Sequence, residues 1–325
     1  MNSSQDGRSP SIIIRLIGTL IGVSLLVYLL SRQGWTEIAA AIHQIPLATI
    51  VLACVLMLTS RLAVSARWHA LLRSSGAGIS LSGATKLTFA GLFAANFLPT
   101  TIGGDVVRLA GVLRGGQARL DAAASIVVDR LIGMAGMATT APVGLVKLAG
   151  WLLPGTVAGL WMTPSLATVA GTPGTSKAER LVESLRQVPK RIGGLLGMWI
   201  RRPGALLAAY CYTWVHMLCL FLLMWLLLRG MGEGISFWLT AGLWSLTYFI
   251  TLLPLSINGL GIQELSAAFI FSQFGGVSAS SSLTLGLLIR TLAMAASLPG
   301  AFFLAAILSG ARSQEPGGPT DPEVE

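Results

Sequence analysis

Residues 205–228 read ALLAAYCYTWVHMLCLFLLMWLLL, and this stretch contains no aspartate, glutamate, lysine or arginine. A helix rises about 1.5 Å per residue, so a helix of this length crosses the roughly 30 Å hydrocarbon core of a bilayer. Within that core a segment must satisfy its own backbone hydrogen bonds, and an α-helix does so alone. The stretch therefore predicts a transmembrane helix.

Similar apolar runs recur on both sides of this stretch. They cover residues 12–30, 45–63, 81–98, 122–148, 151–170, 237–253, 262–274 and 283–308. Of the 325 residues, 54% are hydrophobic and 11% are charged, whereas soluble domains carry about 25% charged residues. We therefore predict an all-α fold, a polytopic transmembrane bundle of about eight helices with broken or re-entrant segments. It forms one domain over residues 1–310, and a disordered acidic tail follows at 311–325.

Positive charge concentrates between the apolar runs. The formal net charge is +9, and residues 172–202 carry seven lysines and arginines. Because basic loops stay in the cytoplasm, residues 61–73, 108–119 and 172–202 are predicted to be cytoplasmic, and residues 33–44 and 230–234 to lie outside. This explains the basic balance without a nucleic-acid partner. We expect a multi-pass protein of a bacterial-type inner (cytoplasmic) membrane with both termini in the cytoplasm.

The cysteines and histidines show no metal-ligand spacing. They are Cys54, Cys211, Cys219, His43, His69 and His216. No C-x-x-C pair is present, so neither a metal nor another cofactor is expected. His216 lies inside the 205–228 stretch, where it either relays protons or bonds a neighbouring carbonyl.

Two stretches share the pattern L-P-x-[ST]-I-[GN]-G, and each ends an apolar run. They are residues 98–104 and 253–259. Proline stops the incoming helix, glycine permits a tight reversal, and the freed backbone groups must face protein or a wet cavity. A helix that restarts there presents free N–H groups to an anion. The predicted hinge residues are Pro99, Gly103, Gly104, Pro254, Asn258, Gly259 and Gly261.

The two stretches have opposite orientations in the predicted topology. The run before Pro99 begins in the cytoplasm, whereas the run before Pro254 begins outside. Two such copies indicate an inverted repeat with a binding site where the broken helices meet. The alternative is a helix kink that the chain uses twice.

Six charged residues fall at bilayer depth, where each costs about 2.5–3.5 kcal/mol unless it is paired or functional. Asp105 and Arg108 are three residues apart and can pair on one helix face. Asp129 and Arg130 are adjacent, so each needs a partner elsewhere. Arg290 is the expected partner of Glu264. We assign all six to substrate binding; the alternative is a salt-bridge network that only fixes helix packing. The six residues are Asp105, Arg108, Asp129, Arg130, Glu264 and Arg290.

Three motifs in order resemble the signatures of the lysylphosphatidylglycerol synthase transmembrane region family. They are NFLPTTIGGDVVR at 96–108, DRL at 129–131 and LPLSINGLGIQE at 253–264, and the similarity covers about residues 12–308. The resemblance implies about eight helices with re-entrant segments. In full-length synthases this region moves an aminoacylated phospholipid between leaflets, and a separate soluble domain attaches the lysine.

The resemblance also limits what is expected of this chain. Only a short tail follows the last apolar run, so we expect no lysyltransferase domain. Asn258 stands where the family usually has glycine, and Gln263 stands where a basic residue is common. Because other stand-alone members are linked to isoprenoid or hopanoid lipids, the resemblance leaves the cargo open.

The leading hypothesis is a lipid flippase or transporter that moves a phospholipid or isoprenoid-type lipid between leaflets. The headgroup phosphate is expected near the helices that restart after Gly104 and Gly261, with the three arginines neutralising it and the three acids orienting them. One alternative is a membrane-embedded lipid transferase that uses an acid as general base. Another is a scaffold or accessory subunit that docks a lipid-modifying enzyme through residues 172–202. The expected partners are therefore membrane lipids and, in the last case, that enzyme. The sequence predicts no oligomeric state.

Overall fold

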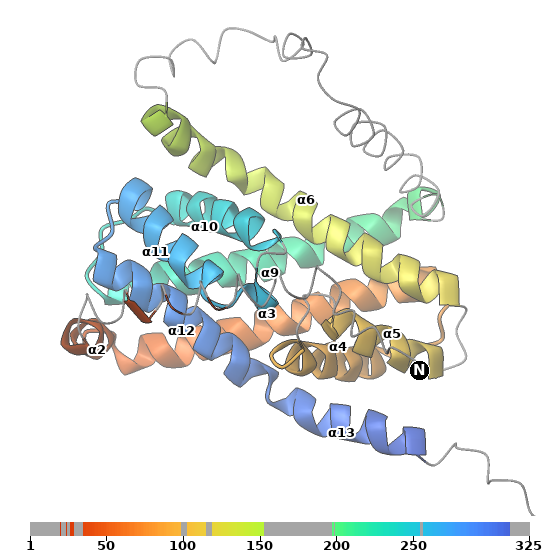
Figure 1. Cartoon of the computed structure of the whole chain (residues 1–325). Coiled ribbons are helices and arrows are strands. Elements are labelled where there is room, and N and C mark those ends of the chain that lie inside the picture. The colour runs from red at the N-terminus through yellow and green to blue at the C-terminus, as the bar shows by residue number, and fades with distance from the viewer. Residues whose placement is uncertain are drawn as a thin grey trace, which may run out of the picture.

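The computed structural model describes residues 35–98, 103–114, 119–152, 199–253 and 256–312, with a few isolated positions besides. These residues form ten α-helices and one 3-10 turn, and no strand occurs among them (Figure 1). The predicted runs 12–30 and 151–170, most of 172–202 and most of the tail lie outside the described residues. The elements are α2 (Trp35–His43), α3 (Leu47–Ser74), α4 (Leu81–Ala95), α5 (Gly103–Arg114), α6 (Arg119–Leu152), α9 (Pro203–Gly230), α10 (Phe237–Thr251), η1 (Ile257–Gly259), α11 (Ile262–Gly275), α12 (Ala279–Ser297) and α13 (Pro299–Arg312).

Four described helices are long and apolar enough to cross a membrane, namely α3, α6, α9 and α12. Helix α9 contains the 205–228 stretch. By contrast, α4 and α10 have 15 residues each and are therefore about 22 Å long, which is shorter than the roughly 30 Å hydrocarbon core. The all-helical bundle is thus confirmed, and it contains both full-length and short helices.

Helices α3 and α9 pack against each other in opposite directions. Gly230, the last residue of α9, lies against Ile45, which precedes α3. At the other end, the indole Nε1 of Trp199, just before α9, donates a 3.3 Å hydrogen bond to the carbonyl of Leu71 near the end of α3. The carboxyl ends of α3 and α9 therefore lie at opposite ends of the bundle.

A short helical hairpin follows each of these two helices. Hairpin α4–α5 follows α3, and hairpin α10–α11 follows α9. Both hairpins begin with a serine N-cap, since Ser80 accepts from the Gly83 N–H at 3.1 Å and Ser236 accepts from the Leu239 N–H at 3.3 Å. Because α3 and α9 end at opposite ends of the bundle, the hairpins that follow them also begin at opposite ends. Figure 1 shows α4–α5 on the right and α10–α11 on the left. This is the inverted arrangement that the two L-P-x-[ST]-I-[GN]-G stretches predict.

The first hairpin is closed by backbone contact between Gly91 of α4 and Gly104 of α5. A Cβ atom on Gly91 would lie 2.6 Å from the Gly104 carbonyl oxygen, and one on Gly104 would lie 2.5 Å from the Gly91 carbonyl oxygen. No other residue type fits at that separation. Helix α5 therefore folds back directly onto α4.

The second hairpin reverses through residues in left-handed conformations. Asn258 has φ +49°, Gly259 +68° and Gly261 +78°. Asparagine is among the few non-glycine residues that tolerate this region, so it can stand in for glycine at 258. The chain therefore turns through left-handed residues between positions 258 and 261. Pro254 and Pro99 lie outside the described residues.

Several predicted boundaries differ from the structure. The predicted loop 61–73 belongs to α3, and residues 108–114 of the predicted loop 108–119 belong to α5. Their arginines lower the hydropathy but do not end a helix, since arginine is a good helix former; Arg67 and Arg108 are buried within the bundle. The predicted run 283–308 is two helices, since Pro299 lacks the N–H that would continue α12. Helix α13 reaches Arg312, two residues into the predicted tail.

Candidate functional site

Five charged side chains from α3, α5 and α6 form one continuous chain of salt bridges, which we call the aspartate cluster. Arg67 Nε lies 2.7 Å from Asp129 Oδ1, and Arg108 Nη2 lies 3.1 Å from Asp129 Oδ2. Arg108 Nη1 lies 3.2 Å from Asp105 Oδ1, and Arg130 Nε lies 2.5 Å from Asp105 Oδ2. The predicted Asp105–Arg108 pair is therefore present. Asp129 and Arg130 each find a partner on another helix, as their adjacency requires.

The cluster is graded from a buried end to an open end. The Asp129 side chain is 2% exposed and both its oxygens accept from arginine, whereas the Arg130 side chain is 37% exposed. Arg108 is held in the middle, with its guanidinium carbon 4.0 Å above the Trp68 ring. Three arginines face two aspartates, so the cluster carries one excess positive charge.

The second charged centre joins α11 and α12. Arg290 Nε donates to Glu264 Oε1, as expected from the sequence. Glu264 Oε2 accepts the Gly261 N–H at 2.9 Å, so this carboxylate caps its own helix. Arg290 Nη2 also donates to the Gly259 carbonyl at 3.2 Å. An anion was expected at the restarting N-terminus of α11, but Glu264 already occupies that position.

The two centres are built alike. Asp105 is the third residue of α5 and pairs with Arg130 on the next helix, α6. Glu264 is the third residue of α11 and pairs with Arg290 on the next helix, α12. Each repeat thus places an acid in the first turn of the returning helix and its arginine on the helix that follows.

Two cavities adjoin these centres. The aspartate cluster lines one of about 210 Å³, which we call the aspartate cavity. Arg61 and Arg290 line the other, of about 270 Å³, which we call the arginine cavity. Asn96 after α4 and Asn258 before α11 also line the arginine cavity, so both hairpins contribute a residue to it.

Three side chains separate the two cavities, because they line both. They are Met137 of α6, His216 of α9 and Tyr248 of α10. His216 Nδ1 lies 2.7 Å from the hydroxyl of Ser60, a side-chain partner in place of the carbonyl that was one of its two expected roles. The bond fixes the ring between the cavities.

An apolar groove of about 290 Å³ opens beside the aspartate cavity. Asp105 and Arg130 line it together with Leu109, Ile126 and Val127 of α5 and α6. Val127 is 38% exposed, so the groove faces the outside of the bundle. Polar and apolar surfaces therefore meet at Asp105 and Arg130.

Two site residues, Arg61 and Arg67, were missed from the sequence because they were assigned to a loop. One signal could have placed them. Residues 47–74 contain neither glycine nor proline, so nothing ends the helix before Arg61 or Arg67. Read as one helix, this segment carries both arginines into the bundle.

Comparison with known families assigns the chain to a family. The model of the lysylphosphatidylglycerol synthase TM region matches residues 15–300, which include both charged centres. This chain belongs to that family. No curated protein matches the chain.

Family membership and the four apolar helices show that the chain is an integral membrane protein. The family links it to lipid metabolism or transport. The six predicted residues do not form one cluster. Asp105, Arg108, Asp129 and Arg130 are joined, whereas Glu264 and Arg290 lie across the Met137–His216–Tyr248 partition.

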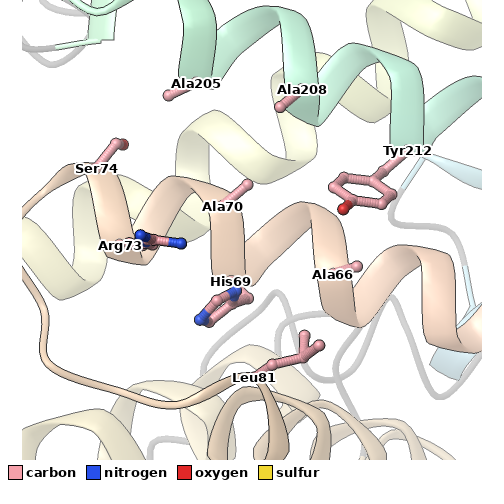
Figure 2. Close-up of a pocket in the computed structure, with 9 residues that line it drawn as sticks. All are labelled: Ala66, His69, Ala70, Arg73, Ser74, Leu81, Ala205, Ala208 and Tyr212. Atoms are coloured by element: carbon pink, nitrogen blue, oxygen red, sulfur yellow. The ribbon is translucent and has the colours of Figure 1, made fainter.

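This protein has a further cavity of about 420 Å³ between α3 and α9, apart from the two charged centres (Figure 2). Four of its nine lining residues are alanines, and His69, Arg73 and Tyr212 supply its larger polar groups. It contains none of the predicted site residues. In the described part of the chain, no three His, Cys, Asp or Glu side chains gather as metal ligands.

Proposed function

We propose that this protein is a lipid flippase or transporter that moves a lipid between the leaflets of a bacterial-type inner membrane, with both chain termini in the cytoplasm. The headgroup passes through the polar cavities while the acyl or prenyl chains stay in the bilayer. The observation that carries this proposal is that Asp105 and Arg130 line both the aspartate cavity and the apolar groove.

A site of this shape suits an amphipathic ligand. The groove offers Leu109, Ile126 and Val127 to a hydrocarbon chain, and the adjoining cavity offers charged groups to a headgroup. A soluble metabolite would leave the apolar groove without a contact, and a wholly apolar lipid would leave the charged side chains without a partner. The combination therefore favours a lipid with a charged headgroup.

The charge balance favours an anionic headgroup. The aspartate cluster has one positive charge more than its carboxylates neutralise. An anion that enters this formally cationic cavity gains charge-assisted hydrogen bonds from the arginines. Arg130, the most exposed member, is the first cation that the headgroup meets.

The partition supplies a route for the headgroup. Met137, His216 and Tyr248 line both cavities, so displacement of these side chains joins the aspartate cavity to the arginine cavity. The hairpins begin at opposite ends of the bundle, which allows one cavity to open while the other is closed. Such an exchange is the usual motion of inverted-repeat transporters.

Proteoliposomes with headgroup-labelled lipid test the proposal. A membrane-impermeant quencher reports how fast label leaves the inner leaflet, and phosphatidylglycerol and an isoprenoid phosphate serve as alternative cargoes. We expect translocation by the wild type, loss with Asp105→Asn and Arg130→Gln, and no change with Arg229→Gln, which removes an exposed arginine at the end of α9. Wild-type rates in folded Asp105→Asn and Arg130→Gln proteins would rule the proposal out.

A further inference from the structure

Arg61 lines the arginine cavity and differs from the four arginines of the two charged centres. Arg67, Arg108, Arg130 and Arg290 each pair with a carboxylate. Arg61 makes no salt bridge within the described part of the chain, and its buried Nε has no hydrogen-bond acceptor. A guanidinium held at membrane depth without an anion is energetically unfavourable, so the protein carries this cation at a cost to its stability.

The described surroundings of Arg61 also lack an acid. Arg61 and Arg290 line the arginine cavity, and no aspartate or glutamate is among the described residues that line it. The carboxylate of Glu264 is engaged by Arg290 and by the Gly261 N–H. No side chain that the structure describes in this cavity therefore neutralises Arg61.

Neutral polar groups complete the cavity. Asn96, Asn258, Gln263 and Ser297 line it, and the amide of Asn96 donates a 2.9 Å hydrogen bond to Ser297. These groups can donate hydrogen bonds to an oxyanion without adding charge. Among the residues that the structure describes, these neutral donors line the same cavity as Arg61, whose guanidinium has no carboxylate partner there, and this combination suits a small anion with several oxygens.

We propose that Arg61 binds the phosphate group of the transported lipid in the arginine cavity, as the cation to which the headgroup transfers after it leaves the aspartate cavity. This inference deepens the proposed function and rests on it. A guanidinium forms paired hydrogen bonds with phosphate oxygens, which a point charge does not reproduce.

The size of the cavity fits this role. Its volume of about 270 Å³ is close to the lower limit of small-molecule sites, about 300 Å³. It therefore has room for a phosphate headgroup and none for two long acyl chains, which stay outside in the bilayer. Short-chain phosphatidylglycerol is accordingly the probe of choice.

Binding to the purified full-length protein is the first measurement. Isothermal titration would compare dioctanoyl phosphatidylglycerol with dioctanoylglycerol, which lacks the phosphate, and with inorganic phosphate and glycerophosphoglycerol. We expect the phospholipid to bind and dioctanoylglycerol not to bind. Arg61→Gln should weaken phospholipid binding by roughly tenfold or more, Arg61→Lys by less, and Arg229→Gln not at all.

The soluble probes identify the source of the phosphate. Tighter binding of the phospholipid than of either soluble probe supports the lipid assignment. Equal affinity for all three phosphate compounds overturns it in favour of a site for soluble phosphate. Equal phospholipid affinity in wild type and Arg61→Gln, or no binding of any probe to the wild type, also overturns the inference.

Thermal unfolding without ligand separates binding from a structural role. Because Arg61 lacks a partner, Arg61→Gln should leave the melting temperature unchanged or raise it. Arg67→Gln should lower it, because the buried carboxylate of Asp129 then loses its closest partner, 2.7 Å away. A drop in Arg61→Gln as large as that in Arg67→Gln would mean that Arg61 supports the fold, and the inference would fail.

The translocation assay keeps the inference and the proposed function apart. If Arg61→Gln moves lipid at the wild-type rate while Arg130→Gln does not, the role of Arg61 is wrong and the transport function stands. If the wild type binds phospholipid through Arg61 but moves none, the binding site stands and the transport function is wrong.

Discussion

Glu264 and Arg290 form an ion pair that also fixes the start of a helix. One oxygen of Glu264 accepts from Arg290 on α12, and the other accepts the Gly261 N–H at the first turn of α11. A single carboxylate, 1% exposed, therefore sets both the direction of the returning helix and its distance from α12. Asp105 and Arg130 have the same relationship in the other repeat, although Asp105 binds Arg108 where Glu264 binds backbone.

The first prediction concerns this pair. Glu264→Gln should lower the free energy of unfolding by about 3 kcal/mol, because Arg290 is left without its counter-charge and α11 loses a charged cap. Thermal unfolding of the purified protein would show it. The double variant Glu264→Gln, Arg290→Gln should recover part of the loss, because no lone charge remains. A double variant as unstable as the sum of the two single variants would contradict the pairing.

The second prediction separates stability from transport within the aspartate cluster. Asp129→Asn should cost about 3–5 kcal/mol, because it leaves Arg67 and Arg108 buried without Asp129 as their shared anion. Arg130→Gln should cost no more than about 1 kcal/mol, because Arg130 is partly exposed and Asp105 keeps Arg108. Melting temperatures give the order, and similar losses in the two variants would refute the graded cluster.

The third prediction tests the close approach of α4 and α5. Gly104→Ala should destabilise the protein by about 1–3 kcal/mol, since the added methyl would lie 2.5 Å from the Gly91 carbonyl oxygen. Gly78→Ala is the matched control, because a Cβ there has no neighbour within 4 Å. Equal melting temperatures for the two variants would show that the hairpin is not closed as described.

The fourth prediction addresses the apolar groove. Val127→Trp should fill it and slow lipid translocation roughly tenfold, which corresponds to about 1.4 kcal/mol of lost lipid binding. The fold should be unaffected, since Val127 is 38% exposed. Leu207→Trp places the same side chain at a position on α9 that is 65% exposed and away from the groove. If both variants transport lipid equally, the groove does not hold the lipid chain.

The fifth prediction uses the left-handed backbone at the second reversal. Asn258 has φ +49°, so Asn258→Gly should keep or slightly raise the stability. Asn258→Val should cost about 1–2 kcal/mol, because a β-branched residue is disfavoured there. Unfolding curves of the two variants should therefore diverge, and coincident curves would argue against this turn.

Much of the fold could be predicted because membrane-spanning helices are recognised in the sequence as long apolar runs. The run 205–228 became α9, and the two L-P-x-[ST]-I-[GN]-G stretches fall at the junctions of α4 with α5 and of α10 with α11. Asp105, Arg108, Glu264 and Arg290 could be paired from helix spacing and from the scarcity of charge at bilayer depth. Each of these inferences depends on local pattern or on very few candidate partners.

The rest depends on contacts between distant segments. Arg67 meets Asp129 across 62 residues of sequence, and hydropathy alone assigned Arg67 to a loop. The charge of an arginine is the same whether it faces water or a buried aspartate, so composition cannot distinguish the two. The partition of Met137, His216 and Tyr248 combines three helices and has no local signal.

The charge balance of the core has an electrical consequence. Counting His216 as neutral, the charged residues described around the two cavities and the second charged centre are five arginines against Asp105, Asp129 and Glu264, which leaves two positive charges there. A charge that crosses the whole membrane potential exchanges about 2.3 kcal/mol per 100 mV. Under the proposed function, this charged core would respond to the membrane voltage, and each anionic headgroup that it bound would reduce that response. Any movement of the empty core would follow the membrane voltage, whereas movement with its cargo would approach electroneutrality.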